Sequence, residues 1–559
     1  MPKMTGARFF AEALQAYGVS YVFFMPGIVK RALFEMDERT NIQRILTHGE
    51  KSAVYMADGY ARACGRPGIC MAQTVGTSNL AAGLRDPYLG CSPVVAITGG
   101  TDPQTHYRNV YQEVEDFSIF EPVTKFNVRV EHVERYPDLL REAFRVATSG
   151  TPGPVHLELM GTGGQLTDNA EGDLEVLVDE ATTQVPAFRP EPEPGSIQEA
   201  ARLLGAAKNP IIVAGGGVRA SGAGPELVEL AEKLSIPIAT ALNAKDTVPA
   251  DHPLSVGVVG VYSRETANRA VLDSDLVFFV GSQTGGQVTN RWRLPRIGTP
   301  VIQLDINPEE LGRNYPLKAA IMGDAKVSLR KLTEAADAAT APSRGEWTER
   351  AKTSVKEWYK EFESLMNSDA VPIRPERICK DLTDRLPPDA LLVADTGHAG
   401  MWTGGMVDLT EPGQGFIRCA GSLGWGLPAV LGAKCALPDR PVVLFTGDGG
   451  FWYHLAEVET AVRRKINAVI LINNNGALSH GLQGLAAIAG GELHGNHEEI
   501  WQYDDTDFAK VAESMGALGI RVDKPSEIGS ALDQAFSADR LVVVDVATDV
   551  MAMAPLAIG

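Results

Sequence analysis

A chain of 559 residues with 44% hydrophobic and 22% charged side chains is an ordinary globular protein, long enough for about three domains. Its net charge of −19 excludes the basic surface that nucleic acid or an anionic membrane requires, so we expect neither as a partner. The sequence shows no apolar signal core and no apolar run near the ~20 residues of a membrane span. Its six cysteines are scattered without a CxxC pair. These features predict a protein of the reducing cytoplasm.

Short apolar runs separated by helical stretches recur along the chain, which is typical of buried parallel strands in an α/β fold. In the first third, strands are expected at Tyr21–Phe24, Arg44–Thr47, Gly68–Gln73 and Pro93–Thr98. A linker rich in proline and acidic residues follows at Phe188–Gly195. We therefore expect a first domain over residues 1–187.

The middle and last thirds repeat this scheme. Further strands are expected at Pro210–Ala214, Leu276–Val280, Pro300–Leu304, Ala390–Asp395, Val442–Thr446, Ala468–Asn473 and Leu541–Val546. We expect a second domain over residues 196–340 and a third over residues 370–559. The expected fold class is α/β, with three doubly wound parallel-sheet domains.

The most informative motif lies where two expected strands of the last third end. Gly447–Gly450, with the sequence GDGG, follows one strand, and the next strand ends in the triple asparagine Asn473–Asn475. Carboxylate and amide oxygens suit Mg²⁺, which completes its octahedron with phosphate and water. The glycines let backbone approach a phosphate and lead into an expected helix at Trp452–Arg464, whose N-terminus attracts anions. The pattern predicts a clamp for Mg²⁺ and a diphosphate, although a Gly-Asp-Gly turn alone also ends many strands that bind no ligand.

This pair of motifs resembles the signature of thiamine diphosphate (ThDP) enzymes, in which an acid and a final asparagine bind Mg²⁺ with a helix and one buried strand between them. The resemblance implies that Asp448, Asn475 and the backbone carbonyl of Ala477 are the metal ligands. It also implies that Gly449 and Gly450 contact the cofactor.

A second segment, Thr47–Arg62, resembles the part of these enzymes that presents the catalytic glutamate at the start of a helix, and Glu50 is the matching residue. The resemblance implies that its carboxyl group shares a proton with pyrimidine N1′ of the cofactor. That proton favours the imino tautomer, whose N4′ takes the proton from thiazolium C2. The alternative is that Glu50 only interacts favourably with a helix dipole, as acids in a first turn commonly do.

A third segment, Gly421–Pro428, resembles the stretch beneath the bent cofactor in this family. Leu423 would be the apolar wedge between the two rings, and the carbonyl of Gly421 would orient the 4′-amino group. The alternative is a glycine-rich turn between a strand and a helix, with a leucine in the core.

The resemblance extends over most of the chain, and the sequence is identified as a member of the acetolactate synthase-like branch of ThDP-dependent enzymes. The supporting segments are Ala7–Pro26, Tyr111–Glu113, Gly150–Pro154, Leu304–Pro308 and Gly323–Lys326. The resemblance implies a pyrimidine-binding domain, a central nucleotide-binding-like domain and a diphosphate-binding domain, with the first and last structurally related. It also implies an obligate homodimer, or a homotetramer built from it, because Glu50 would act on the cofactor held by the partner chain.

Other candidate contacts are carried over by position. Gly397 and His398 lie where relatives contact the diphosphate. The candidate substrate contacts are Val29, Gln112, His480 and Gln483. A purely structural role is the alternative for each of these side chains.

The middle domain leaves its ligand open. Gly215–Gly217 after one strand and Asp305 at the end of another suit a nucleotide, and acetolactate synthases bind FAD in this domain. Gln283 and Gly285 stand where those synthases usually have an arginine and an aspartate-rich turn. FAD, ADP or CoA, and no ligand at all are therefore the three alternatives.

The expected function is decarboxylation of a 2-oxo acid such as pyruvate, followed by ligation of the remaining unit to a second carbonyl, as in acetolactate synthases. Gly100 and Gly484 replace a glutamine and a tryptophan that the synthases have near the substrate. A ThDP-dependent lyase or decarboxylase, resembling benzaldehyde lyase or 2-hydroxyacyl-CoA lyase, is therefore the alternative. A catalytically inactive regulatory homologue is a further alternative, which the retention of Glu50 and Leu423 disfavours.

Overall fold

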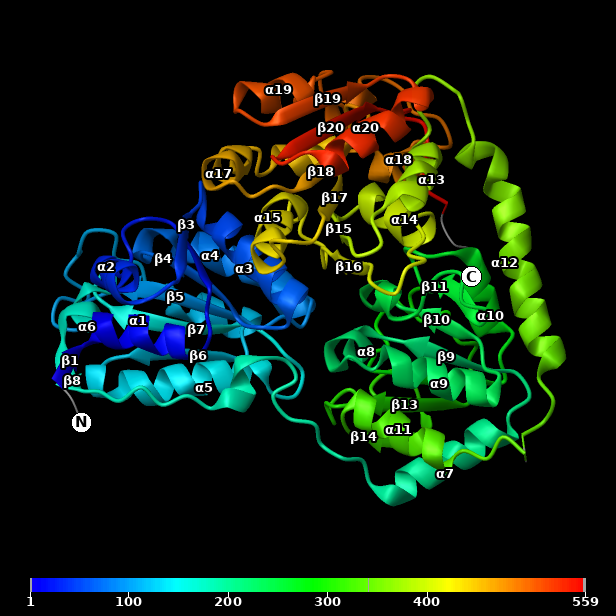
Figure 1. Ribbon diagram of the computed structural model, residues 1–559, viewed down its shortest axis with the longest axis horizontal. Coiled ribbons are helices and arrows are strands. Elements are labelled where there is room, and N and C mark those ends of the chain that lie inside the picture. The colour runs from blue at the N-terminus through cyan, green and yellow to red at the C-terminus, as the bar shows by residue number, and fades with distance from the viewer. Residues whose placement is uncertain (1–2, 340, 556–559) are drawn as a thin grey trace.

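The computed structural model describes residues 3–339 and 341–555, which form three α/β units (Figure 1). Each unit is built on a six-stranded sheet in which every pair of neighbouring strands is parallel. This architecture confirms the predicted fold class. Among the described residues, no helix is long and apolar enough to cross a membrane.

The first sheet has the strand order β3-β2-β4-β5-β7-β6. Its strands are β2 (Tyr21–Phe24), β3 (Gln43–Leu46), β4 (Gly68–Ala72), β5 (Val94–Gly100), β6 (Phe126–Val130) and β7 (Val155–Met160). Its helices are α1 (Gly6–Ala16), α2 (Lys30–Arg39), α3 (Glu50–Cys64), α4 (Thr77–Leu89), α5 (Tyr136–Thr148) and α6 (Gln165–Asn169). A small antiparallel pair, β1 (Lys3–Thr5) and β8 (Glu171–Asp173), closes one side.

The central sheet has the order β11-β10-β9-β12-β13-β14, which is the 3-2-1-4-5-6 order of dinucleotide-binding folds. Its strands are β9 (Pro210–Ala214), β10 (Ile238–Thr240), β11 (Ser255–Val258), β12 (Leu276–Val280), β13 (Val301–Asp305) and β14 (Leu317–Met322). Its helices are α7 (Pro194–Ala206), α8 (Gly216–Ser221), α9 (Gly224–Leu234), α10 (Glu265–Leu272) and α11 (Ala325–Ala335). The long helix α12 (Gly345–Met366) runs beside this unit toward the third one (Figure 1).

The third sheet has the order β16-β15-β17-β18-β20-β19. Its strands are β15 (Leu391–Ala394), β16 (Gly415–Arg418), β17 (Val442–Gly447), β18 (Val469–Asn474), β19 (Leu518–Val522) and β20 (Val542–Ala547). Its helices are α13 (Pro375–Arg385), α14 (His398–Gly405), α15 (Gly426–Ala436), α16 (Asp448–Trp452), α17 (Glu457–Arg464), α18 (Leu482–Ile488), α19 (Phe508–Ser514) and α20 (Pro525–Ser537). Numbered along the chain, the first and third sheets share the order 2-1-3-4-6-5, so the implied relation between these thirds is confirmed.

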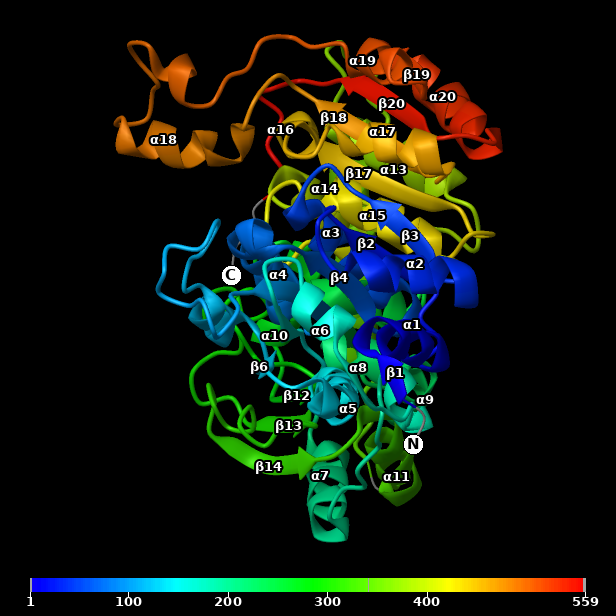
Figure 2. The ribbon, with the colours of Figure 1, turned by 90° about the vertical axis from the view of Figure 1, so that its left-hand side faces the viewer.

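One sequence prediction about the third unit is wrong. The helix expected at Trp452–Arg464 is two helices, because α16 begins at Asp448 itself and ends before a separate α17 begins at Glu457. Beyond β18, α18 and the loop after it extend away from the sheet (Figure 2).

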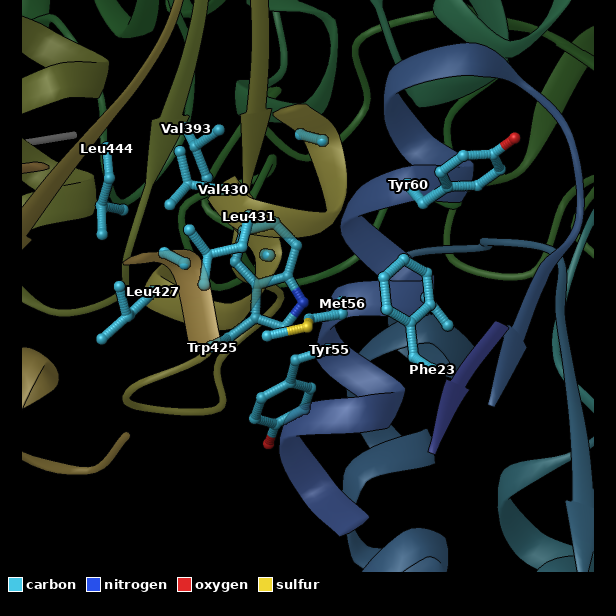
Figure 3. Packing of buried hydrophobic residues seen from close by; sticks show 14 of the residues in the cluster. Phe23, Tyr55, Met56, Tyr60, Val393, Trp425, Leu427, Val430, Leu431 and Leu444 are labelled. Atoms are coloured by element: carbon cyan, nitrogen blue, oxygen red, sulfur yellow. The ribbon is translucent and has the colours of Figure 1, made fainter. Parts of the chain in front are cut away.

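The first and third units contact each other through α3 and α15, whose backbones approach very closely. A Cβ atom added to Gly59 would overlap the carbonyl oxygen of Ala429, and one added to Gly432 would overlap that of Met56. Large buried side chains surround the crossing, among them Trp425 (Figure 3). Only glycine allows two helices to pack this closely, so these two positions fix how the units sit together.

Replacing Gly432 with alanine should lower the free energy of unfolding by about 1–3 kcal/mol, because the added methyl group has no space at the crossing. Gly205→Ala in α7 is the matched control, since nothing lies within 4 Å of a Cβ atom there. Alanine at position 205 should be neutral or stabilise by up to about 1 kcal/mol. Denaturant unfolding measures both variants, and equal effects would contradict the close contact.

Candidate functional site

A cavity of about 330 Å³ lies at the carboxyl ends of β15, β17 and β18. Of the residues expected to contact the cofactor, those lining the cavity are Gly397, His398, Leu423, Asp448, Gly449, Gly450, Asn475 and Ala477. His480, an expected substrate contact, also lines it, and Tyr262 reaches it from the central unit. Gly421 lies exposed in the loop that carries Leu423 and is not part of the described lining. The third unit thus assembles most of the expected site on its own.

Asp448 and Asn475 lie at the ends of neighbouring strands, as the motif predicts. The Asp448 carboxylate is 2% exposed and accepts a hydrogen bond of 2.9 Å from the backbone N–H of Ala477. Burial raises the pKa of Asp448 to about 6, against the opposing effect of backbone N–H groups. Asn475 donates from Nδ2 to Ser479 Oγ at 2.9 Å, but its Oδ1 is buried without a partner among the described residues.

An unsatisfied buried amide oxygen beside a buried carboxylate is costly unless a cation binds both. Carboxylate, amide and carbonyl oxygens are hard ligands that suit Mg²⁺ or Ca²⁺. The described residues contain no group of three His, Cys, Asp or Glu side chains that could hold a metal ion. The donors at this edge of the sheet therefore fit a hard cation that takes its remaining oxygens from a ligand and water.

Asp395, at the end of β15, holds the loop between β16 and α15 in place. Its fully buried carboxylate accepts hydrogen bonds from the backbone N–H groups of Gly424 and Gly426, at 3.2 and 3.0 Å. Burial raises the pKa of Asp395 to about 6. Asp395 is not among the residues expected at the site, although an acid directly after a buried strand is a usable sequence signal.

His398 lines the cavity as a neutral ring. Its Nδ1 and the Ser479 hydroxyl are 3.1 Å apart, and the rings of His398 and His480 meet edge to face at 5.5 Å. Burial, with a smaller contribution from His480, lowers the pKa of His398 to about 4. The ring therefore serves as a hydrogen-bonding group at neutral pH. Ser479 links Asn475 to His398, and no sequence signal pointed to it.

Glu50 is the first residue of α3 and belongs to a different environment. Asn79 donates a hydrogen bond of 3.2 Å to its Oε2, and a Cβ atom on Gly76 would lie 2.5 Å from its Oε1. Glycine at position 76 thus leaves the space that this carboxylate occupies. Glu50 is not among the described residues lining the cavity of its own chain.

The remaining candidates are dispersed. Val29 is fully buried in the core of the first unit, with a left-handed backbone at φ 34°. Gln112 lies on the loop before β6, also at positive φ, and neither residue is among the described cavity lining. The side chain of Gln483 lies outside what the structure describes. The substrate contacts expected of these three residues stay predictions.

A larger cavity of about 830 Å³ lies where the three units meet. Gly215–Gly217, Gln283, Gly285 and Asp305 line it, so the expected nucleotide-binding elements converge. Arg418 also faces it, donating to Asn243 Oδ1 at 2.8 Å, and pairs with no carboxylate among the described residues. Glycine-rich backbone and an arginine without an ion pair suit an anionic ligand.

Comparison with known proteins shows which family has this arrangement of domains. Three regions match the thiamine pyrophosphate (ThDP) enzymes: their N-terminal TPP binding domain over residues 4–119, their central domain over 197–332 and their C-terminal TPP binding domain over 395–546. The probable acetolactate synthase large subunit of Methanocaldococcus jannaschii is 33% identical over 557 residues, covering 98% of this chain and 92% of that protein. The chain belongs to the thiamine pyrophosphate enzyme family.

Other relatives of this family give the same picture. The acetolactate synthase large subunit of Corynebacterium glutamicum is 31% identical over 97% of this chain and 86% of that protein. The large subunit of acetolactate synthase isozyme 2 from Escherichia coli is 29% identical over 98% of this chain and 96% of that protein. These similarities confirm the predicted acetolactate synthase-like branch.

Proposed function

We propose that this chain is a ThDP- and Mg²⁺-dependent enzyme that decarboxylates a 2-oxo acid such as pyruvate and joins the remaining unit to a second carbonyl. Its similarity to acetolactate synthase large subunits supports this reaction. The observation that carries the proposal is the buried pair of Asp448 and the unsatisfied Asn475 Oδ1, in a cavity lined by Leu423. The domain ranges 1–187, 196–340 and 370–559 are part of this proposal.

The roles of the residues follow from their places. Asp448, Asn475 and the Ala477 carbonyl would hold Mg²⁺, and Gly449 and Gly450 let backbone approach a diphosphate. Leu423 supplies an apolar surface for the cofactor rings. Bound ThDP supplies an electron sink next to the cleaved carbon–carbon bond. Neutral His398 and His480 donate or accept hydrogen bonds without adding charge.

Glu50 would hold the proton that activates the cofactor. In one chain it lies outside the cavity, so we propose that it enters the cavity of a partner chain. A homodimer is then the smallest active form, with a homotetramer as a larger assembly of the same dimers. The cysteines are all free thiols in the structure, which suits the reducing cytoplasm that we propose as its location.

One observation favours the alternative of a ThDP-dependent lyase or decarboxylase. A Cβ atom on Gly100 would lie 2.5 Å from Glu158, whose buried side chain fills the space beside that glycine. Burial raises the pKa of Glu158 to about 7 despite its ion pair with Arg129. A glutamine at position 100, as in the synthases, could not be accommodated without moving Glu158. The substrate side therefore differs in shape from that of the synthases.

Incubation with pyruvate, ThDP and Mg²⁺ should yield acetolactate or acetoin, because the proposed reaction joins two carbonyl compounds. Product analysis by chromatography and mass spectrometry separates the two functions. Acetaldehyde as the only product would contradict ligation and support a plain decarboxylase. A panel of other 2-oxo acids and acyl-CoA thioesters tests the lyase alternative in the same way.

Glu50→Gln should slow exchange of the C2 proton of bound ThDP with solvent deuterium by orders of magnitude, because the amide cannot share a proton with the pyrimidine ring. ThDP should still bind. Acid-quenched exchange read by proton NMR measures the rate without a substrate. Glu346→Gln, at the exposed acid in the first turn of α12, is the control and should exchange like the unaltered enzyme. Equal exchange in the Glu50 variant would contradict the proposed role.

Mg²⁺-dependent ThDP binding should weaken below about pH 6. The pKa of Asp448 is raised to about 6, so the carboxylate is protonated below that pH and must lose its proton to bind Mg²⁺. Calorimetric titration from pH 5 to pH 8 should show affinity falling about tenfold per pH unit below 6 and level above it. Affinity that does not change between pH 5 and pH 7 would contradict metal binding by Asp448.

We infer that the larger cavity suits a nucleotide, supported by Gly215–Gly217, Asp305 and the unpaired Arg418. FAD, ADP and CoA share the phosphates that such a site takes. Denaturing the purified protein and recording the absorbance of the released small molecules decides between them. Flavin absorbance identifies FAD, and adenine absorbance alone identifies ADP or CoA. Release of neither would contradict a tightly bound nucleotide.

A further inference from the structure

Asp86, on α4 of the first unit, is bonded to the loop of the third unit that carries Gly421 and Leu423. Its side chain is fully buried. The backbone N–H of Ala420 donates to Oδ1 and Oδ2 at 3.0 and 3.1 Å, and that of Ser422 donates to Oδ2 at 3.1 Å. These two peptide groups lie on either side of Gly421.

Other bonds also hold this loop, since the carbonyl of Ser422 accepts from the Cys419 thiol and from the backbone N–H of Trp425, each at 3.0 Å. Gly421 has φ 149°, and no heavy atom lies within 4 Å of where its Cβ would be. Among the described residues, its own N–H donates to the sulfur of Cys419 alone, at 3.2 Å. Asp86 thus holds the peptide groups on both sides of Gly421, and Asp395 holds the loop further on, at Gly424 and Gly426.

Arg62 on α3 compensates the buried negative charge of Asp86 by an ion pair. Its Nη2 lies 2.9 Å from Asp86 Oδ1 and 2.6 Å from Asp58 Oδ2. Asp58 in turn accepts a hydrogen bond of 2.8 Å from the indole N–H of Trp425. A buried carboxylate needs such a charged partner and several hydrogen bonds, and Asp86 has both.

Near Glu50 the roles of the two units are exchanged, because a carboxylate of the third unit holds backbone of the first unit. Glu457, at the start of α17 in the third unit, is 1% exposed, and its Oε1 accepts the backbone N–H of His48 at 2.9 Å. Its other oxygen accepts from the hydroxyl of Thr460 at 2.7 Å. His48 lies two residues before Glu50, so Glu457 holds the backbone that leads into Glu50 at the start of α3.

We propose that Asp86 and Glu457 are positioning residues, each holding by peptide N–H groups the segment of the opposite unit that faces a cofactor. The inference rests on the proposed function for the purpose of these segments, but the anchoring itself does not. Hydrogen bonds to peptide groups fix the direction of the backbone. Two domains can pack against each other through side chains without such bonds. Helix α3 begins at Glu50, next to the segment that Glu457 holds, and carries near its other end Arg62, which pairs with Asp86, so one helix connects the two anchors.

Amide hydrogen exchange in the full-length chain without cofactor tests the anchors directly. In the unaltered protein, the amides of His48, Ala420 and Ser422 should exchange slowly although they lie outside helices and strands. Asp86→Asn keeps the shape of the side chain but replaces one acceptor oxygen with a donor. It should speed exchange in residues 419–423 about tenfold or more and leave residues 47–49 unchanged.

Glu457→Gln should give the reverse pattern, with faster exchange at residues 47–49 alone. Asp58→Asn is the matched control, because it weakens the other ion pair of Arg62 and leaves the bonds from Asp86 to the N–H groups of Ala420 and Ser422 in place. Exchange at those two amides should stay within about threefold of the unaltered protein in this control. An equal increase in both Asp variants would show that the ion pair alone matters and would overturn the role of Asp86.

A kinetic measurement separates positioning from general stability. In both anchor variants kcat should fall at least about tenfold with KM for the 2-oxo acid nearly unchanged, since the cofactor is misaligned and the substrate pocket is not. Fast exchange of the three amides in the unaltered protein overturns the proposal, even if a variant fails to fold. Slow exchange in a protein that forms no product from any 2-oxo acid would overturn only the proposed function.

Discussion

The close approach of α3 and α15 at Gly59 and Gly432 is the constraint on which the rest of the structure depends. Backbone meets backbone at this crossing, so the two units have no freedom to slide or rotate. In that fixed arrangement Glu50 points into its own unit, near Gly76 and Asn79, while Asp448 lies in a separate cavity. Within one chain, Glu50 is therefore outside the described lining of the cavity that holds Asp448.

Burial of polar groups without full compensation marks the place where a ligand fits. Asp448 is buried with its pKa raised to about 6, and Asn475 Oδ1 lacks a partner among the described residues. A net charge of −19 does not attract an anionic cofactor, so the proposed Mg²⁺ and local backbone N–H groups would have to supply the attraction. The chain thus keeps a strained polar pair at the edge of an otherwise well-packed sheet, as binding sites commonly do.

Sequence patterns predicted the parts of the fold that depend on local physics. Runs of apolar residues located the central strands, and glycine, acid and amide residues at strand ends located most of the cavity lining. Strands such as β6 and β16 were not predicted, because they lack long apolar runs. Asp86 was missed for a different reason, since its partner Ala420 lies 334 residues away in the sequence, and the bond between Ser479 and His398 likewise joins distant segments. The break between α16 and α17 likewise follows from packing, which periodicity does not report.

The central claim is that a complete site needs Glu50 from one chain and Asp448 from another. Co-expression of a Glu50→Gln chain with an Asp448→Asn chain, followed by purification on a different tag for each, isolates mixed dimers. Each mixed dimer has one intact site and one doubly altered site, so activity should be about half that of the unaltered dimer. Mixed dimers no more active than either variant alone would contradict the claim that the site forms between chains.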